Sequence, residues 1–222
     1  MAFQFERPRN FLFKAGQFVD LALLSARGYA SDGLIHTFSI ASSPSAEEIV
    51  VATRMRDTAF KRALSTLAIG ADVRLKGPMG SFTLHNNVSR PAVFLAGGIG
   101  IAPFLSMISS TAPNKAHPPI SLFYANRYFE DAPFIDTLRE FESSTGSFRF
   151  VPTLTRAGKV PREWKGETGH ISPEMLSRHV STLQHSICYV AGPPNMVLAA
   201  RLALDEAGVS EDDIRTEEFA GY

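Results

Sequence analysis

Residues 93–103 read VFLAGGIGIAP, an apolar run that passes into a glycine-rich turn and then into a segment containing a proline. The run predicts a buried strand, and Pro103 suits the first turn of a helix, where the missing N–H would have no partner anyway. Gly97, Gly98 and Gly100 would let the backbone approach a diphosphate, whose charge is favoured by free N–H groups and the helix dipole. A tight turn that needs positive φ at one glycine is the alternative, but three glycines exceed that need. The stretch therefore predicts a nucleotide-phosphate site at the carboxyl end of a strand.

From this stretch onward, short apolar runs alternate with segments of helical spacing. We expect strands over Ala92–Ala96, Ile120–Tyr124, Phe148–Leu154, Ile187–Val190 and Arg215–Phe219, and helices over Ala102–Ser110, Pro133–Phe141, Pro173–Val180 and Met196–Ala207. Alternation of nearly all-apolar strands with helices indicates a parallel sheet covered on both faces. Residues 89–222 are therefore expected to form an α/β Rossmann-like domain.

A second turn of the same kind, Gly192-Pro193-Pro194 before Met196, again links an apolar strand to a helix start. Open α/β sheets bind ligands at the carboxyl ends of their strands. Gly-Pro-Pro is common turn chemistry and says little alone. Together with the first glycine turn, it outlines one cleft.

The first 88 residues show a different pattern, in which short predicted strands are separated by Gly, Pro and Ser. Strands at this spacing, without long helices between them, suggest an antiparallel barrel or sandwich. One helix is expected over Thr58–Leu67, with Asp57 or Thr58 as its N-cap. The strands are expected over Gln17–Leu23, His36–Ala41, Glu48–Arg54 and Asp72–Lys76. The sequence thus predicts two domains, an N-terminal antiparallel β-barrel over residues 1–88 and the α/β domain over residues 89–222.

Composition limits the kinds of partner and site. The chain has 22 Lys and Arg and 22 Asp and Glu, so no overall field recruits nucleic acid or an anionic membrane. Its single cysteine, Cys188, lies in an apolar run, which favours a buried structural thiol. The six histidines lack metal-ligand spacing, and we find neither a signal peptide nor an 18-residue apolar stretch. We expect a cytoplasmic protein with no metal, no nucleic-acid partner and no membrane span.

Six short segments, in the same order along the chain, resemble motifs of the ferredoxin–NADP reductase superfamily. They are Phe13–Phe18, His36–Ser42, Gly77–Phe82, Gly97–Pro103, Ala191–Met196 and Glu217–Tyr222. Each motif is modest alone, but six in register make chance a poor explanation. The resemblance covers essentially the whole chain. It implies a flavin-binding β-barrel, then a domain that binds a nicotinamide dinucleotide, with the reaction in the cleft between them.

The resemblance implies a flavin-binding motif that is usually Arg-x-Tyr-Ser in the family and here consists of His36, Thr37, Phe38 and Ser39. Phe38 would lie against the flavin ring and Ser39 near the nitrogen that receives hydride, with ordinary strand core as the alternative for Phe38. His36 replaces the arginine, and a neutral imidazole gives a phosphate at most one directed hydrogen bond. We expect weaker or pH-sensitive flavin retention unless Arg54 or Arg56 compensates.

Two further segments are implied to contact the rest of the flavin nucleotide. The family's Gly-x-x-Ser pattern at a helix start corresponds to Ala59, Phe60 and Lys61. Amides at a helix N-terminus favour an anion, and Lys61 either adds charge or is a solvated helix residue. The strand that flanks the outer phosphate and the adenine aligns with Ala52, Thr53 and Arg54. This alignment favours FAD over FMN.

The C-terminal segment is implied to lie at the reacting centre. Glu218 matches a family acid near the nicotinamide. Tyr222 resembles a terminal aromatic that covers the flavin and yields when nicotinamide stacks, so it would act as a gate. A frayed terminus is the alternative for Tyr222. The catalytic candidates are Ser39, Glu218 and Tyr222.

The nicotinamide nucleotide is implied to contact residues that follow four strands. Thr155-Arg156 resembles a Ser-Arg pair that grips a 2′-phosphate, which slightly favours NADPH over NADH, although both Arg127 and Arg156 would also suit plain surface positions. The residues implied are Asn126, Arg127, Thr155 and Arg156 for the ribose, and Gly97, Gly98, Gly100, Pro103, Gly192, Pro193 and Met196 around the phosphates.

These residues predict a flavin-dependent oxidoreductase that takes hydride from NADPH or NADH onto bound FAD and passes electrons to a redox protein or another acceptor. Two alternatives stay open. The protein could reduce free flavin as a substrate, or it could be a non-catalytic electron-transfer or nucleotide-sensing subunit of a larger complex. The sequence does not specify the acceptor.

Overall fold

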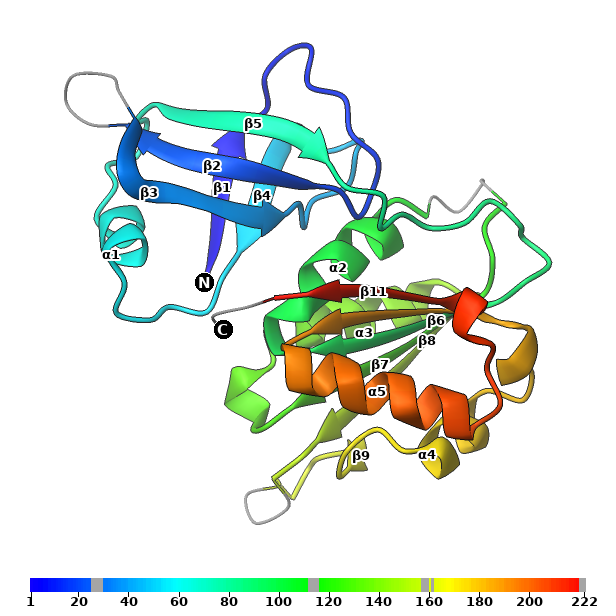
Figure 1. Cartoon of the computed structure of the whole chain (residues 1–222). Helices are drawn as coiled ribbons and strands as arrows, with labels where there is room; N and C mark the ends of the chain where they lie inside the picture. The colour runs from blue at the N-terminus through cyan, green and yellow to red at the C-terminus, as the bar shows by residue number, and fades with distance from the viewer. Residues whose placement is uncertain (25–29, 112–115, 157–159, 161, 220–222) are drawn as a thin grey trace.

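The computed structural model describes the whole chain except residues 25–29, 112–115, 157–159, 161 and 220–222. Figure 1 shows two parts, a group of small sheets formed by the N-terminal residues and a larger sheet flanked by helices formed by the rest. The sequence-based fold class, antiparallel strands followed by an α/β unit, is confirmed.

The N-terminal part contains two antiparallel sheets, one pairing β1 with β4 and the other ordered β3-β2-β5. An isolated bridge between Ile40 and Val51 joins the two sheets. The strands are β1 (Ala2–Glu6), β2 (Phe18–Leu24), β3 (Ala30–Ser39), β4 (Glu48–Ala52) and β5 (Val73–Met79). The expected strands are thus all present, because alternating apolar residues such as Val19 and Leu21 fill one core between the sheets.

The expected helix of this part is α1 (Ala59–Ser65). Thr58 is its N-cap, with a hydroxyl that accepts a hydrogen bond from the backbone N–H of Lys61 at 3.3 Å. Phe60 and Leu64 bury their side chains against the strands. The helix therefore closes one side of the N-terminal core.

The C-terminal part is a six-stranded sheet in the order β11-β10-β6-β7-β8-β9, and every pair is parallel. Its strands are β6 (Ala92–Gly97), β7 (Ile120–Asn126), β8 (Phe148–Leu154), β9 (Glu167–Thr168), β10 (Ile187–Gly192) and β11 (Ile214–Glu218). Every residue of β6 is buried. Phe94 faces one core and Leu95 the other, which explains why the sequence shows a continuous apolar run.

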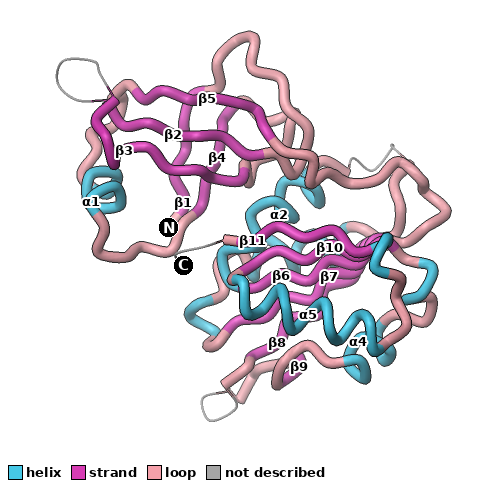
Figure 2. The backbone as a smooth tube through the Cα atoms, in the orientation of Figure 1, coloured by secondary structure: helices cyan, strands magenta, loops and turns pink. Residues whose placement is uncertain are grey.

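Helices cover both faces of this sheet (Figures 1 and 2). The first core includes side chains of α2 (Ile101–Ser109) and α3 (Ile135–Ser144), and the second includes side chains of α4 (Pro173–His179) and α5 (Pro194–Glu206). Short 3₁₀ segments are η1 (Gly98–Gly100), η2 (Phe129–Asp131), η4 (Leu183–His185) and η5 (Glu211–Asp213). Helix α3 begins two residues later than expected, because Phe134 adopts a left-handed φ of 61°.

The two parts share a packed junction. Ala41 and Phe82, both N-terminal to the large sheet, belong to the same core as α2. The hydroxyl of Ser106 on α2 donates to the carbonyl of Ser42 at 2.6 Å. A Cβ on Gly16 would lie 2.4 Å from the Cε of Met107 on α2, so the segment before β2 also packs against this helix. The junction therefore holds the segment that follows β3 against α2.

Candidate functional site

The two glycine turns predicted to bind phosphates press against each other. A Cβ on Gly100 would lie 2.2 Å from the carbonyl oxygen of Ala191, and one on Gly192 would lie 3.2 Å from the Cα of Gly97. Gly98 has a φ of +54° and open space around it. Gly100 and Gly192 therefore leave no room for a side chain between the two turns, and Gly98 adopts a backbone conformation that favours glycine.

The helices that follow these turns start as the sequence predicts. Pro103 lies in the first turn of α2, and α5 begins at Pro194, directly after Pro193. Met196 lies beside both turns, since a Cβ on Gly97 or Gly192 would come within 3.1 Å of its sulfur. The structure thus brings the phosphate-site residues predicted on β6 and β10 together at one edge of the sheet.

At the end of β11 the structure places Glu217, rather than the predicted Glu218, at the junction. Glu218 is exposed, whereas Glu217 is half-buried and its Oε2 atom is buried. Burial raises the pKa of Glu217 to about 7, and the hydroxyl of Ser39 acts in the opposite direction by lowering this pKa. Glu217 is paired in register with Ala191 of β10. The acid that faces the N-terminal part is therefore Glu217.

Ser39 and Glu217 face each other without a hydrogen bond of normal geometry. Ser39 Oγ and Glu217 Oε2 are buried atoms that have no hydrogen-bond partner among the described residues. Buried polar atoms in native proteins are nearly always paired, so these two atoms mark a place where a ligand with polar ring atoms would be accepted. The donor and acceptor set here fits the reactive edge of a flavin ring.

His36, Phe38 and Phe60 form an aromatic cluster inside the N-terminal part. The ring centroid of Phe38 lies 4.9 Å from that of His36 and 5.7 Å from that of Phe60. Phe38 is 2 % exposed. This arrangement favours the strand-core interpretation of Phe38 over a free stacking face. Thr37 points the other way and donates its hydroxyl hydrogen to Asp20 at 2.6 Å.

Positive groups gather around the start of α1. Lys61 is 3 % exposed, and its ammonium donates to the carbonyl of Arg54 at 2.7 Å. Burial and then the charge of Arg56 lower the pKa of Lys61, while burial and then Lys61 lower the pKa of His36. A diphosphate placed here would offset both the burial and the mutual repulsion. The donor set therefore fits the phosphate end of a flavin nucleotide.

The other residues predicted to contact the flavin nucleotide are less available. Ala52 and Thr53 are buried, and the exposed Ala59 precedes Phe60 on α1. The guanidinium of Arg54 forms an ion pair with Asp131 of η2, in the C-terminal part. Arg54 thus crosses the junction, which the sequence did not indicate.

The residues predicted to contact the ribose lie at the ends of β7 and β8. Asn126 is buried, and its carbonyl accepts from the backbone N–H of Thr155 at 2.8 Å. Arg127 and Arg156 are exposed. The structure therefore brings these two strand ends together but leaves both arginines on the surface. The predicted gate, Tyr222, lies outside the described residues.

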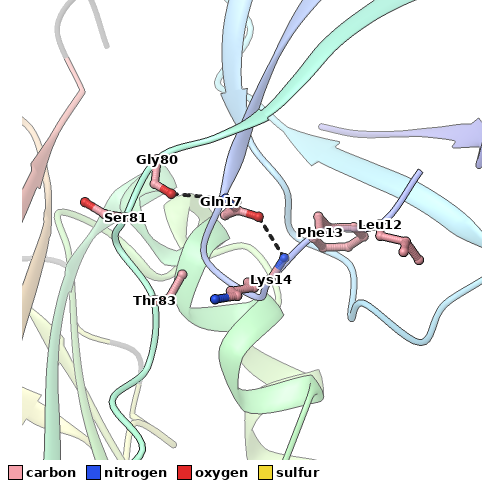
Figure 3. A pocket seen from close by; sticks show the side chains of 7 residues that line it. All are labelled: Leu12, Phe13, Lys14, Gln17, Gly80, Ser81 and Thr83. Atoms are coloured by element: carbon pink, nitrogen blue, oxygen red, sulfur yellow. Dashed lines mark hydrogen bonds between the residues drawn. The ribbon is translucent and has the colours of Figure 1, made fainter. Parts of the chain in front are cut away.

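A separate hollow lies on the N-terminal part. Figure 3 shows this open pocket of about 470 Å³ between residues 12–17 and residues 80–83. Gln17 bridges its two walls by accepting from the backbone N–H of Lys14 and donating to the carbonyl of Gly80. None of its seven described lining residues is a predicted site residue, but five of them belong to Phe13–Phe18 and Gly77–Phe82, two of the segments that carry the family resemblance.

The described residues contain no cluster of three or more His, Cys, Asp or Glu suited to a metal ion. Over the same residues, no helix combines the length and the apolar character required to cross a membrane. Cys188 is buried, and burial raises the pKa of its thiol to about 12. The thiol therefore stays protonated at neutral pH.

Comparisons with known proteins agree with this geometry. The family model of the oxidoreductase NAD-binding domain matches residues 94–202. Ferredoxin–NADP reductase B of Sorangium cellulosum is 30% identical over 230 residues, which cover 97% of this chain and 89% of that protein. The reductase component of propane 2-monooxygenase from Mycolicibacterium goodii is 30% identical over 217 residues. That match covers 96% of this chain and 60% of the longer relative.

Solved structures share the fold over nearly the whole chain. The FAD/NAD-binding domain of a nitric oxide dioxygenase from Vibrio cholerae superposes with a TM-score of 0.82 at 16% identity, covering 98% of this chain and 91% of that one. A ferredoxin–NADP reductase from Neisseria gonorrhoeae with bound FAD and NADP gives 0.78 at 24% identity, with the same coverage of 98% and 91%. The chain therefore belongs to the ferredoxin–NADP reductase superfamily.

Proposed function

We propose that this protein takes hydride from a reduced nicotinamide dinucleotide onto bound FAD and passes the electrons to a separate redox protein. The observation that carries the proposal is that Ser39 and Glu217 lie close together across the junction. They lie beside the two glycine turns, because Glu217 is in register with Ala191, which Gly100 contacts. Two buried polar atoms that lack a hydrogen bond of normal geometry thus lie next to the edge where a dinucleotide would bind. Family membership supports the same reaction class.

When bound, FAD supplies the change from a two-electron hydride acceptor to a one-electron donor. The chain's own residues would orient the reactants. The glycine turns would offer backbone N–H groups and the start of α2 to the nucleotide's diphosphate. Ser39 Oγ would donate to or accept from the ring atom in front of it.

Glu217 would hold a proton at its carboxyl near neutral pH, because burial raises its pKa to about 7. A protonated carboxyl can donate a hydrogen bond to a polar group of the bound rings, whereas the carboxylate can only accept one. The protonation state of Glu217 would therefore set the polarity of the site in the neutral range.

For the electron donor we propose NADPH over NADH. The support is the position of Arg156 directly after Thr155 at the end of β8, exposed and beside the strand end that carries Asn126. A guanidinium is suited to a 2′-phosphate by charge and shape. For the acceptor we propose a redox protein or an oxygenase component, because the relatives above are named as a ferredoxin–NADP reductase and an oxygenase reductase component.

Reduction of free flavin is the second candidate, and the burial of Phe38 favours it. A ring stacked on Phe38 would have to displace part of the cluster with His36 and Phe60. Flavin would then be held less tightly than a resident cofactor. A colourless purified protein that oxidises NADPH only with added flavin would support this candidate.

An anaerobic absorbance titration tests the proposal. FAD added to the protein should bind, and its band near ~450 nm should bleach with NADPH faster than with NADH. Absence of binding or of bleaching would contradict the proposal. The variant Lys61→Met should raise the FAD dissociation constant about tenfold or more, the scale of one lost charge-assisted hydrogen bond.

Arg62→Met is the matched control for Lys61→Met. Arg62 is the next residue of α1, is exposed and forms an ion pair with Asp57 rather than facing the buried side. Its loss should leave FAD affinity unchanged. Equal weakening by both variants would assign the effect to net charge and remove Lys61 from the site.

A further inference from the structure

A buried hydrogen-bond network lies behind the candidate site and centres on Tyr189 of β10. The Tyr189 side chain is completely buried. Its hydroxyl oxygen accepts from the backbone N–H of His85 at 2.9 Å and from the guanidinium of Arg215 at 3.0 Å. These two donors use both lone pairs, so the hydroxyl hydrogen is left for His85 Nδ1, which lies 3.0 Å away.

The partners of His85 fix its tautomer. His85 Nε2 lies 2.9 Å from the carbonyl oxygen of Arg90, which can only accept, so Nε2 carries the proton and Nδ1 accepts from Tyr189. The imidazole is therefore neutral. Burial, and to a smaller extent the charges of Arg215 and Arg90, lower the pKa of His85, which agrees with this assignment. Every polar atom of the Tyr189–His85 pair is thus satisfied.

Arg215 connects this network to β11. Its guanidinium lies over the Tyr189 ring, 5.2 Å from the centroid, and also donates to the carbonyl of Thr83 at 3.2 Å. Thr83 belongs to the segment that leads from β5 to β6. Arg215 therefore ties three pieces of chain together, namely β11, β10 and this connecting segment.

The contacts of Arg215 with Tyr189 and Thr83, called the Arg215 tie below, matter because of the position of β11 in the sheet. β11 is an edge strand whose one neighbour in the sheet is β10, and it lies on the side of the sheet next to the N-terminal part (Figures 1 and 2). Residues two apart on a strand point to the same face, so Arg215 and Glu217 share a face. An edge strand has neighbouring backbone groups to pair with on one side only, so side-chain contacts such as those of Arg215 add to what holds it in place.

We infer that Arg215, together with Tyr189 and His85, is a positioning residue that holds the end of β11 so that Glu217 stays buried against Ser39. The inference rests on the proposed function only for the use that the reaction makes of Glu217. The geometry itself concerns the protein without a ligand. Loss of the Arg215 tie should let the end of β11 move outward and expose the Glu217 carboxyl to water.

Ser39 of β3 is the side chain that acts on the Glu217 carboxyl, and Arg215 is the nearest basic residue on the same strand. Arg90 is engaged by Asp213 at 2.7 Å and by the carbonyls of His185 and Ser186. A change in the titration of Glu217 on removal of Arg215 can thus be compared with removal of the uncharged Tyr189 hydroxyl.

The test is a carboxyl-carbon NMR titration of the protein without flavin, with Glu217→Gln used to assign the Glu217 signal. The wild-type midpoint should lie near 7. In Arg215→Met and in Tyr189→Phe it should fall by one unit or more toward the ordinary glutamate value of 4.5, because water reaches the carboxyl. Removal of a nearby positive charge alone would move the midpoint upward in Arg215→Met, so a fall reports exposure.

Thr216→Val is the control, because Thr216 is exposed on the opposite face of β11, and its midpoint should equal that of the wild type. Arg215→Lys, which can still reach one acceptor, should give an intermediate value. Unchanged or raised midpoints in both Arg215→Met and Tyr189→Phe would overturn the inference. If either variant fails to fold, the other decides the result.

The same samples separate this inference from the proposed function. Fallen midpoints in a protein that never reduces flavin would support the positioning role and refute the proposed reaction. Unmoved midpoints in variants of a protein that does reduce flavin would refute the positioning role and leave the reaction supported. In the active case, the pH midpoint of flavin reduction should shift with the NMR midpoint.

Discussion

At the scale of single residues, Glu217 determines how the folded state responds to pH. Its folded-state pKa is about 7, above the ordinary value of 4.5, because burial disfavours the carboxylate. The folded protein therefore binds this proton more tightly than the unfolded chain does. The stability that the protonated carboxyl contributes is complete below pH 4.5 and is lost as the pH rises through 7.

We therefore predict that Glu217→Gln becomes progressively more stable than the wild type between pH 4.5 and 7, with a constant difference above that range. The upper bound on this difference is about 3 kcal/mol, from 1.36 kcal/mol per pKa unit. Melting temperatures of both proteins from pH 4 to 8.5 provide the measurement. Glu218→Gln is the control and should follow the wild type, because Glu218 is exposed. A difference that does not depend on pH would show that the carboxyl has the same pKa in the folded and the unfolded protein.

The adjacent glutamates also mark the limit of what the sequence could predict at this scale. The resemblance pointed to Glu218, and two identical neighbours cannot be told apart by motif. Strand direction decides between them, since alternate residues of β11 face opposite ways. The core position of Phe38 was open for a similar reason. Its ring packs on Phe60, which lies 22 positions away along the chain in the printed sequence.

At the scale of elements, the two glycine turns act as one unit. The Gly100 Cα faces the backbone of Ala191 with no room for a methyl group, whereas Gly98 has free space and a left-handed φ. The two glycines are therefore needed for different reasons, and alanine at each position should have a different cost.

We predict that Gly100→Ala destabilises the protein by about 1–3 kcal/mol and weakens nucleotide binding, because the new methyl group would push the β10 turn away from η1. Gly98→Ala should cost about 1 kcal/mol, which is the penalty for a left-handed residue with a Cβ. Denaturant unfolding and calorimetric titration with NADP⁺ measure the two effects. Gly146→Ala, where a Cβ meets nothing, is the control for unfolding. A larger loss for Gly98→Ala than for Gly100→Ala would contradict the close contact.

Element positions were largely predictable because local pattern determines them. Buried strands such as β6 are continuous apolar runs, and the N-cap Thr58 and the turn before Pro103 mark helix starts. β9 escaped prediction because two residues carry no pattern. The start of α3 was misjudged because the left-handed Phe134 has no sequence signal of the kind that glycine gives.

At the scale of the whole molecule, the junction depends on pairs that lie far apart in sequence. Ser42 accepts from Ser106, and Arg54 pairs with Asp131, and neither partner is marked by any local pattern. The sequence predicted two parts and a reaction between them, but it gave no information on how the parts touch. Arg54 in particular was assigned to the flavin phosphate, whereas its guanidinium lies against the other part of the molecule.

This last contact leads to a prediction about flavin binding. Arg54 is 47% exposed and Asp131 is 26% exposed, so the ion pair itself is worth about 0.2–1 kcal/mol and weakens in salt. A flavin diphosphate near Lys61 would compete with Asp131 for the guanidinium, because Lys61 holds the Arg54 backbone. Asp131→Asn should therefore tighten FAD severalfold at low ionic strength and slightly lower the stability of the protein without flavin.

The measurement is a fluorescence titration with FAD at about 20 mM and 500 mM salt, since the Debye length falls from roughly 20 Å to 4 Å over this range. The gain in affinity should shrink at high salt. Arg54→Met should weaken FAD and make a second change at Asp131 ineffective, because the two residues act through the same ion pair. Asp136→Asn, in an exposed pair with Arg139 on α3, should change neither quantity. If Asp131→Asn weakens FAD instead, then the ion pair holds the two parts in the binding geometry, and Arg54 acts on the flavin through the junction rather than through the phosphate.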